Sequence, residues 1–243
     1  KKLKKKSKNK SIRGKIVIPM IIDTIEQSFF MSTRWTGLPC TSITTSLTNQ
    51  ITQNNRQDTS HTPLVTQTSL HETLELLLSA SNPPFNKLWF HGGETLLQIE
   101  LFKQLIEIIP KKKTAIYLET NGSLPNYLKE IIAHITGLSV TIFPEFLGES
   151  IETLQEWLYS KKDTTYLSIN IPIKKGFLAQ ELSATYQWIH SIDPTLSICL
   201  EPTPNFIRKK IATPKKDILR ALTLSKKYFK TVQVSPEINH ILK

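Results

Sequence analysis

The chain has 243 residues, of which 31 are lysine or arginine and 20 are aspartate or glutamate, so its formal net charge is +11. That length suits one domain, or two, with a sizeable apolar core. No stretch reaches the roughly 18 consecutive apolar residues of a membrane helix. Two cysteines exclude a disulfide scaffold, and they exclude a metal or iron–sulfur site made of three or four thiolates of this chain.

Most of the positive charge lies in residues 1–15, which hold nine basic residues and no acidic one. Setting these nine aside leaves 22 basic against 20 acidic side chains in residues 16–243, a surplus of two. We expect residues 1–15 to be a disordered basic tail, either a solubilising extension or a weak contact for RNA or an acidic partner. No apolar segment of signal-peptide type follows the tail directly, so we expect a cytoplasmic protein.

The first part of the folded region contains two segments of different character. Residues 16–22 (IVIPMII) are apolar and predict a first strand or the approach to one, although Pro19 interrupts them. Residues 40–68 are rich in Thr, Ser, Asn and Gln, which predicts a long polar loop.

From residue 69 onward, segments with helical and strand patterns alternate. A capping box, Ser69–Glu72, starts the first helix. The predicted helices cover residues 70–78, 97–109, 124–135, 149–160, 179–191 and 214–228. The predicted strands cover residues 87–91, 114–118, 138–143, 165–171, 196–200 and 231–234. This order predicts an α/β fold, in which residues 16–243 form a single domain with about six parallel strands in an open or partial (β/α) barrel.

In such folds, ligands bind in the loops that follow the strands. One loop follows the run Leu88–Glu94 (LWFHGGE), where Gly92 and Gly93 let a ligand approach the backbone and offer it their amides. Glu94 can hold a cation, and an ammonium such as the α-amine of an amino acid fits this arrangement. The alternative is a tight turn with a solvated glutamate, and the sequence favours neither.

Two further runs carry less information when each is taken alone. The run Tyr117–Ser123 ends a strand and contains the turn dipeptide Asn121-Gly122, so a simple turn is the commoner interpretation. In the run Ser32–Pro39, Arg34 can bind a carboxylate, but a solvated arginine is again the commoner case.

Together and in this order, the three runs resemble the radical S-adenosylmethionine enzymes, and within them the 7-carboxy-7-deazaguanine synthase family of queuosine biosynthesis. The corresponding segments are 24–39, the loop near 48–59, 90–95, 119–123 and 234–240. The resemblance implies a partial (β/α) barrel of the radical SAM type, which forms a homodimer and acts on a carboxy-tetrahydropterin. It also implies S-adenosylmethionine, a [4Fe-4S] cluster and Mg²⁺ as cofactors.

The resemblance also implies which residues of this chain contact ligands. The implied cofactor-binding residues are Gly92, Gly93, Glu94, Glu119, Thr120 and Asn121. The implied substrate-binding residues are Arg34 and His240.

The cluster-binding motif of the family, CxxxCxxC, is missing. Its three positions fall on Thr48, Thr52 and Asn55, and a shifted register places them on Gln50, Asn54 and Gln57. Hydroxyls and amides do not hold a low-potential iron–sulfur cluster. Without a cluster nothing donates the electron that cleaves S-adenosylmethionine, so the sequence supports neither the cluster nor Mg²⁺, and only S-adenosylmethionine stays a candidate cofactor.

Other family positions have changed as well. The Gln-Gly-Glu-Gly stretch is Phe30–Thr33, an expected arginine is Thr44, and the proline after Gly-Gly-Glu is Thr95. The terminal glutamine and histidine are Glu237 and Asn239, although the adjacent His240 can stand in with a shift of register.

Three interpretations therefore stay open. The first is a degenerate homologue of the family, a pseudoenzyme with no catalytic residues for radical chemistry. The second is a lyase of the same pathway that uses a cluster supplied by a partner or altered chemistry. The third is a non-catalytic module that binds S-adenosylmethionine, a pterin or another small molecule in a regulatory role. Nucleic acid is not expected as a partner, apart from nonspecific contact by the basic tail.

Overall fold

The computed structural model of the chain describes residues 20–30, 38–45, 66–68, 75, 79, 83–110, 114–147, 166–205, 210–211 and 213–234. The disordered tail, the helix predicted over 149–160, and the positions Arg34, Thr48, Thr52, Asn55 and His240 lie outside these residues. The helix predicted over 70–78 is described only at Glu75, which is helical.

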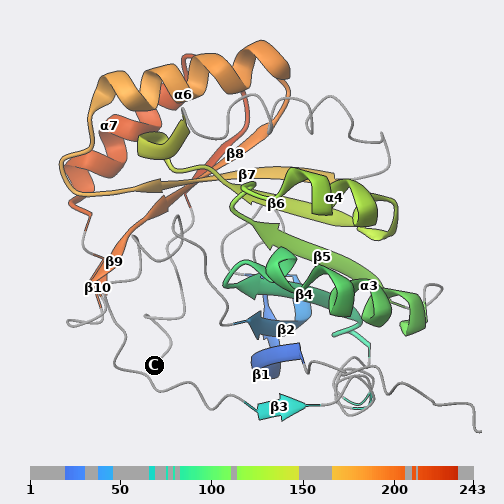
Figure 1. Cartoon of the computed structure of the whole chain (residues 1–243). Helices are drawn as coiled ribbons and strands as arrows, with labels where there is room; N and C mark the ends of the chain where they lie inside the picture. The colour runs from blue at the N-terminus through green and yellow to red at the C-terminus, as the bar shows by residue number, and fades with distance from the viewer. Residues whose placement is uncertain are drawn as a thin grey trace, which may run out of the picture.

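The described part of the chain forms one large sheet of nine strands and a two-stranded ribbon (Figure 1). The strands of the large sheet are β1 (Met20–Phe29), β2 (Pro39–Thr45), β3 (Thr66–Thr68), β4 (Lys87–Gly92), β5 (Ala115–Thr120), β6 (Gly137–Thr141), β7 (Tyr166–Ile173), β8 (Ser197–Pro202) and β11 (Val232–Val234). The ribbon pairs β9 (Pro204–Asn205) with β10 (Lys210–Ile211).

The order of the large sheet is β11-β8-β7-β6-β5-β4-β2-β1-β3. The neighbours from β11 to β2 are parallel, and β1 is antiparallel to both β2 and β3. Consecutive parallel strands from β4 to β8 are thus adjacent in space, as the βαβ pattern of the sequence predicts. The sequence predicted about six parallel strands, and the sheet has seven because β2 joins them.

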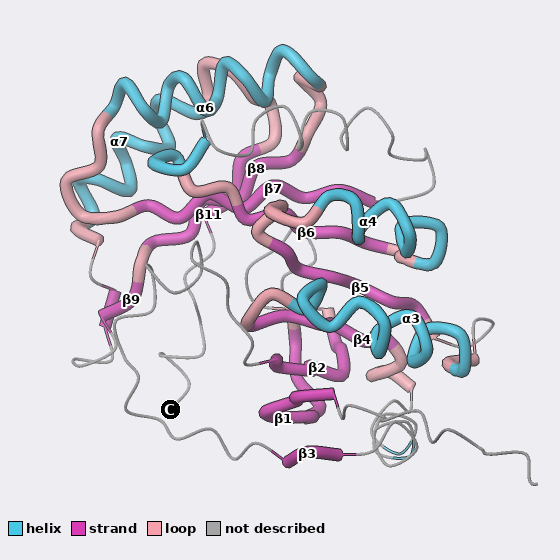
Figure 2. The backbone as a smooth tube through the Cα atoms, in the orientation of Figure 1, coloured by secondary structure: helices cyan, strands magenta, loops and turns pink. Residues whose placement is uncertain are grey.

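The helices lie along one face of this sheet (Figure 2). They are η1 (Thr95–Gln98), α3 (Ile99–Ile108), α4 (Pro125–Ile131), η2 (Ile132–His134), η3 (Pro144–Phe146), α6 (Ala179–Ile192) and α7 (Lys215–Ser225). The main core fills the space between helices and sheet, where for example Phe90 of β4 packs edge-on against Phe102 of α3 at a ring distance of 4.8 Å. No helix in the described residues is long and apolar enough to cross a membrane.

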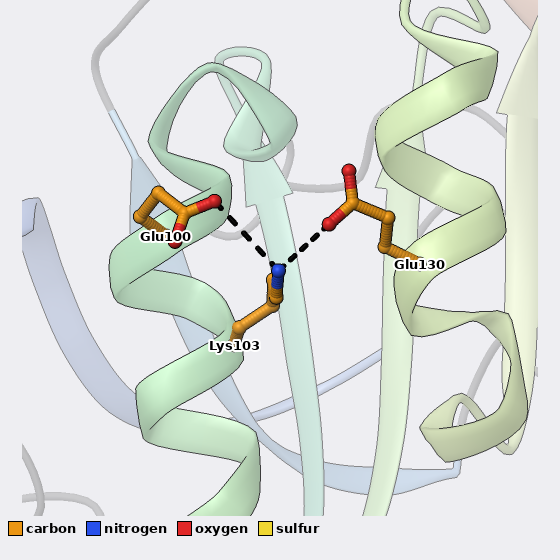
Figure 3. A network of polar contacts seen from close by, with 3 residues as sticks. All are labelled: Glu100, Lys103 and Glu130. Carbon is orange, nitrogen blue, oxygen red and sulfur yellow. Dashed lines mark hydrogen bonds and ion pairs between the residues drawn. The ribbon is translucent and has the colours of Figure 1, made fainter.

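The side of the core that faces solvent carries an ion-pair network between two neighbouring helices (Figure 3). Lys103 of α3 lies 2.7 Å from Glu130 of α4 and 3.7 Å from Glu100 of its own helix. The hydrogen bond to Glu130 is the main reason that the pKa of Lys103 is raised. Because these groups are exposed, the network orients α3 against α4 more than it stabilises the fold.

The opposite face of the sheet is polar. Register partners in a parallel sheet point to the same side, and side chains alternate along each strand. The pairs Glu119↔Ser139, Ser139↔Ser168, Thr141↔Asn170 and Pro172↔Glu201 therefore share one face. We call the surface formed by Ser42, His91, Glu119, Ser139, Thr141, Ser168, Asn170 and Glu201 the polar face.

One prediction about the fold was wrong. Residues 40–45 were expected to begin a polar loop, but they form most of β2 and are largely buried between β1 and β4. The segment reads CTSITT, and its β-branched residues suit a strand. Its polar side chains are accommodated because the strand contributes to the polar face, so low hydrophobicity did not mean a loop. Residues 46–65 of the predicted loop lie outside the described residues.

Candidate functional site

The candidate site lies where β4 and β5 end side by side. Glu94 follows β4 directly and is completely buried. Its carboxylate accepts a hydrogen bond from the amide of Leu96 at 3.2 Å, which caps η1. The carboxylate therefore belongs to the local turn that leads from the strand into the helix.

The end of β5 supplies the other partners of the same carboxylate. The Thr120 hydroxyl lies 3.0 and 2.9 Å from its two oxygens, and the Asn121 amide donates to one of them at 2.9 Å. Thr120 in turn accepts from the Gly122 amide at 3.2 Å. Two runs that are 26 residues apart in the sequence thus fold around one carboxylate.

Burial and hydrogen bonding act on Glu94 in opposite directions. Loss of hydration raises its pKa, while the bonds from Asn121, Thr120 and Leu96 lower it. Burial prevails, and the pKa of Glu94 is raised to about 6. The carboxylate is therefore held at a cost, and that cost falls when it is protonated.

The two glycines before Glu94 have a clear structural role. Gly92 has φ +98°, and a Cβ atom there would lie 2.7 Å from Thr44 Cγ2 and 3.0 Å from the Thr45 carbonyl oxygen. The Gly93 amide donates to that same oxygen at 2.6 Å. The glycines thus let the end of β4 approach the end of β2.

The structure therefore brings together all six residues for which the resemblance implies cofactor binding. Thr120 and Glu94 are buried, whereas Gly92, Gly93, Glu119 and Asn121 are half-buried. In this arrangement the carboxylate that could hold an ammonium is already bonded to three protein groups. The expected contact between Glu94 and S-adenosylmethionine stays a prediction.

Below this point, a histidine is held against the polar face. The ring of His91 stacks on Trp89 at a centroid distance of 3.8 Å, and its Nε2 lies 2.7 Å from the Ser42 hydroxyl. Trp89 continues into a small apolar cluster with Phe30, Cys40 and Tyr117. The sequence favoured a structural role for His91, and these contacts give it one.

The polar face contains a feature that the sequence analysis missed. Ser139 and Asn170 are completely buried, and Thr141 is 9% exposed. Their side-chain hydroxyls and both polar atoms of the Asn170 carboxamide have no hydrogen-bond partner in the described structure. Such a buried group costs about 1–3 kcal/mol, which is substantial against a net stability of about 5–15 kcal/mol for a whole domain.

The charges around these three side chains are acidic. Glu119 of β5 and Glu201 of β8 share the polar face with them. The register places Lys87, which pairs with Ala115, at the opposite end of the strands. Within the described strands, no lysine or arginine shares the polar face at the level of Thr141 and Asn170, so the surroundings disfavour an anion.

A separate cavity of about 260 Å³ lies at the ends of β6 and β7. Its lining includes Pro144, Pro172, Phe177 and Leu182, and Lys174 forms an ion pair with Glu145 beside it. Gly176 in the same loop donates its amide to Asp217 of α7 at 3.0 Å. The lining is mainly apolar, and no polar atom in it is reported without a partner within the described residues.

The thiols are far from any arrangement suited to iron. Cys40 on β2 and Cys199 on β8 are both buried, and burial raises the pKa of Cys40 to about 12. The described residues contain no group of three His, Cys, Asp or Glu side chains that could hold a metal ion. Iron–sulfur clusters need thiolates, so the residues present do not fit such a cluster.

Comparison with known proteins yields a match in structure alone. No model of a known protein family matches the chain, and no curated protein matches its sequence. The crystal structure of QueE from Escherichia coli matches it with a TM-score of 0.51 and 13% sequence identity, over 90% of this chain and 93% of that chain. At this identity the match shows the fold, which is a partial (β/α) barrel of the radical SAM type.

Proposed function

We propose that the protein is a degenerate homologue of 7-carboxy-7-deazaguanine synthase that performs no radical chemistry. QueE is a member of that enzyme family, so the fold agrees with the family that the sequence motifs resemble. The two best retained motifs of the sequence also meet at one place, the carboxylate of Glu94. This common centre explains why both motifs persist in a chain that has lost others.

The observation that carries the proposal is the absence of cluster ligands. The chain has two cysteines, and both are buried on strands of the sheet rather than placed in the segment that corresponds to the cluster loop. A radical S-adenosylmethionine enzyme needs the cluster to donate an electron to its cofactor. The retained contacts of Glu94 instead serve the fold.

Anaerobic reconstitution with iron and sulfide tests this proposal. We expect the wild-type protein to bind no stoichiometric iron and to show no charge-transfer absorption of an iron–sulfur cluster. A variant that carries Thr48→Cys, Thr52→Cys and Asn55→Cys is the positive control, because it restores the family spacing. One [4Fe-4S] cluster per wild-type chain would overturn the proposal.

The alternative of a lyase with a partner-supplied cluster makes a different prediction. In that case the protein should convert carboxy-tetrahydropterin in a complete reducing mixture that contains S-adenosylmethionine and a cell extract. We expect no product under those conditions. Product formation that depends on this chain would replace our proposal with the alternative.

A further inference from the structure

The buried polar groups of β6 and β7 point to a ligand. Asn170 presents a donor, Nδ2, and an acceptor, Oδ1, and both lack a partner in the described structure although the side chain is completely buried. A carboxamide in this state is complementary to a molecule that carries an acceptor and a donor side by side. Asparagine pairs in this bidentate way with the edge of adenine.

Two hydroxyls accompany the carboxamide on the same face. Thr141 is the register partner of Asn170, and Ser139 lies two residues earlier on β6. Both hydroxyls are buried without a hydrogen-bond partner in the described residues. Each can donate or accept, so together they extend the recognition surface beyond a single amide.

We propose that Asn170, Ser139 and Thr141 form a binding site for a neutral heterocycle whose edge carries adjacent hydrogen-bond donor and acceptor atoms, such as a nucleobase. The ligand is neutral because the neighbouring charges on the polar face are the carboxylates of Glu119 and Glu201. The site goes beyond the proposed function, and its existence does not depend on whether the chain binds iron.

Calorimetric titration of the full chain with adenine, cytosine and uracil, each used separately, tests the proposal. We expect at least one of them to bind saturably with a Kd below about 1 mM. Asn170→Ala should weaken that binding by roughly 5- to 150-fold, the effect of losing one bidentate contact. Asn126→Ala is the control, because Asn126 is exposed on α4, and it should leave the affinity unchanged.

Orotate tests the requirement for neutrality. It keeps the edge of uracil and adds a carboxylate, so it should bind more weakly than uracil if uracil binds. Binding of none of the three bases at 5 mM, roughly fivefold above the expected limit, would overturn the proposal. Equal affinity of wild type and Asn170→Ala would also overturn it.

Thermal unfolding without ligand supplies a second readout. Thr141→Val removes an unpaired hydroxyl at nearly constant shape, so it should leave Tm unchanged or raise it. Thr185→Val is the matched control, because the equally buried Thr185 donates to the Glu181 carbonyl at 2.9 Å, and it should lower Tm by about 2–4 °C. An equal decrease in both variants would mean that the Thr141 hydroxyl bonds to the protein itself, which would overturn its assignment.

Discussion

The hydroxyl of Thr120 lies within 3.0 Å of both carboxylate oxygens of the buried Glu94. This contact joins the end of β5 to the turn after β4. It is also the point at which the two retained sequence motifs meet. Because Glu94 has no exposed surface, the contact stabilises the edge of the sheet where ligands bind in folds of this class.

Replacing Thr120 should destabilise the protein in a pH-dependent way. Thr120→Val removes the hydroxyl donor from a buried ionised group, which should lower the free energy of unfolding by about 1.5–3 kcal/mol at pH 7.5. The loss should be smaller below pH 5, where Glu94 is protonated. Urea denaturation at both pH values measures it. The exposed Thr223, replaced by valine, is the control, and an equal loss at both pH values would contradict the prediction.

The titration of Glu94 should appear in the stability of the whole protein. Its pKa is about 6 in the folded state against an ordinary value of 4.5, so the folded state binds the proton more tightly. The stabilisation is complete below pH 4.5 and is lost as the pH rises through 6, by about 2 kcal/mol in total. Glu94→Gln should remove this component. The prediction fails if the difference in unfolding free energy between wild type and variant stays constant from pH 4 to 8.

Two glycines with positive φ should respond unequally to alanine. At Gly92, the left-handed backbone and the contact with Thr44 both oppose a Cβ atom, so Gly92→Ala should cost more than about 2 kcal/mol. At Gly176, φ is +71° but nothing lies within 4 Å of the added atom, so Gly176→Ala should cost about 1 kcal/mol. Chemical denaturation of both variants compares them. If Gly176→Ala cost as much, crowding by β2 would not be the reason for Gly92.

Periodicity was sufficient to predict most of the sheet. The strands predicted at 87–91, 114–118, 138–143, 165–171, 196–200 and 231–234 correspond to β4, β5, β6, β7, β8 and β11. Each is a short apolar run between polar turns, and each is followed in the sequence by a helical pattern except the last. Local patterning therefore suffices where a strand is covered on one face by its own crossover helix.

The same reasoning failed where tertiary contacts, and not hydrophobicity, stabilise the strand. Thr41 of β2 donates to the Phe85 carbonyl at 2.8 Å, and Ser42 is bonded to His91, so its polar side chains are buried with partners from distant parts of the chain. No local pattern contains those partners. The polar face could have been suspected from the alternation of Ser139 with Thr141 and of Ser168 with Asn170 in otherwise apolar strands.

The candidate site was predictable in position but not in its internal contacts. The rule that ligands bind at the carboxyl ends of strands located Gly92–Glu94 and Glu119–Asn121 correctly at one edge. It could not show that Glu94 turns inward to bond with Thr120, because the direction of a side chain after a turn depends on the neighbouring strand. Burial of the carboxylate thus became visible only in the structure.

The two thiols should be inert in the native protein. Both cysteines are buried, and a pKa of about 12 keeps Cys40 protonated at pH 8, whereas reaction with an aromatic disulfide reagent requires an exposed thiolate. We expect no thiol to be labelled on the timescale of minutes in the native protein and both to be labelled in guanidinium. Cys40→Ala and Cys199→Ala should each leave one thiol to be labelled after denaturation. Rapid native labelling at pH 8 would show an accessible thiolate, and it would weaken the argument that this chain offers no sulfur ligand to iron.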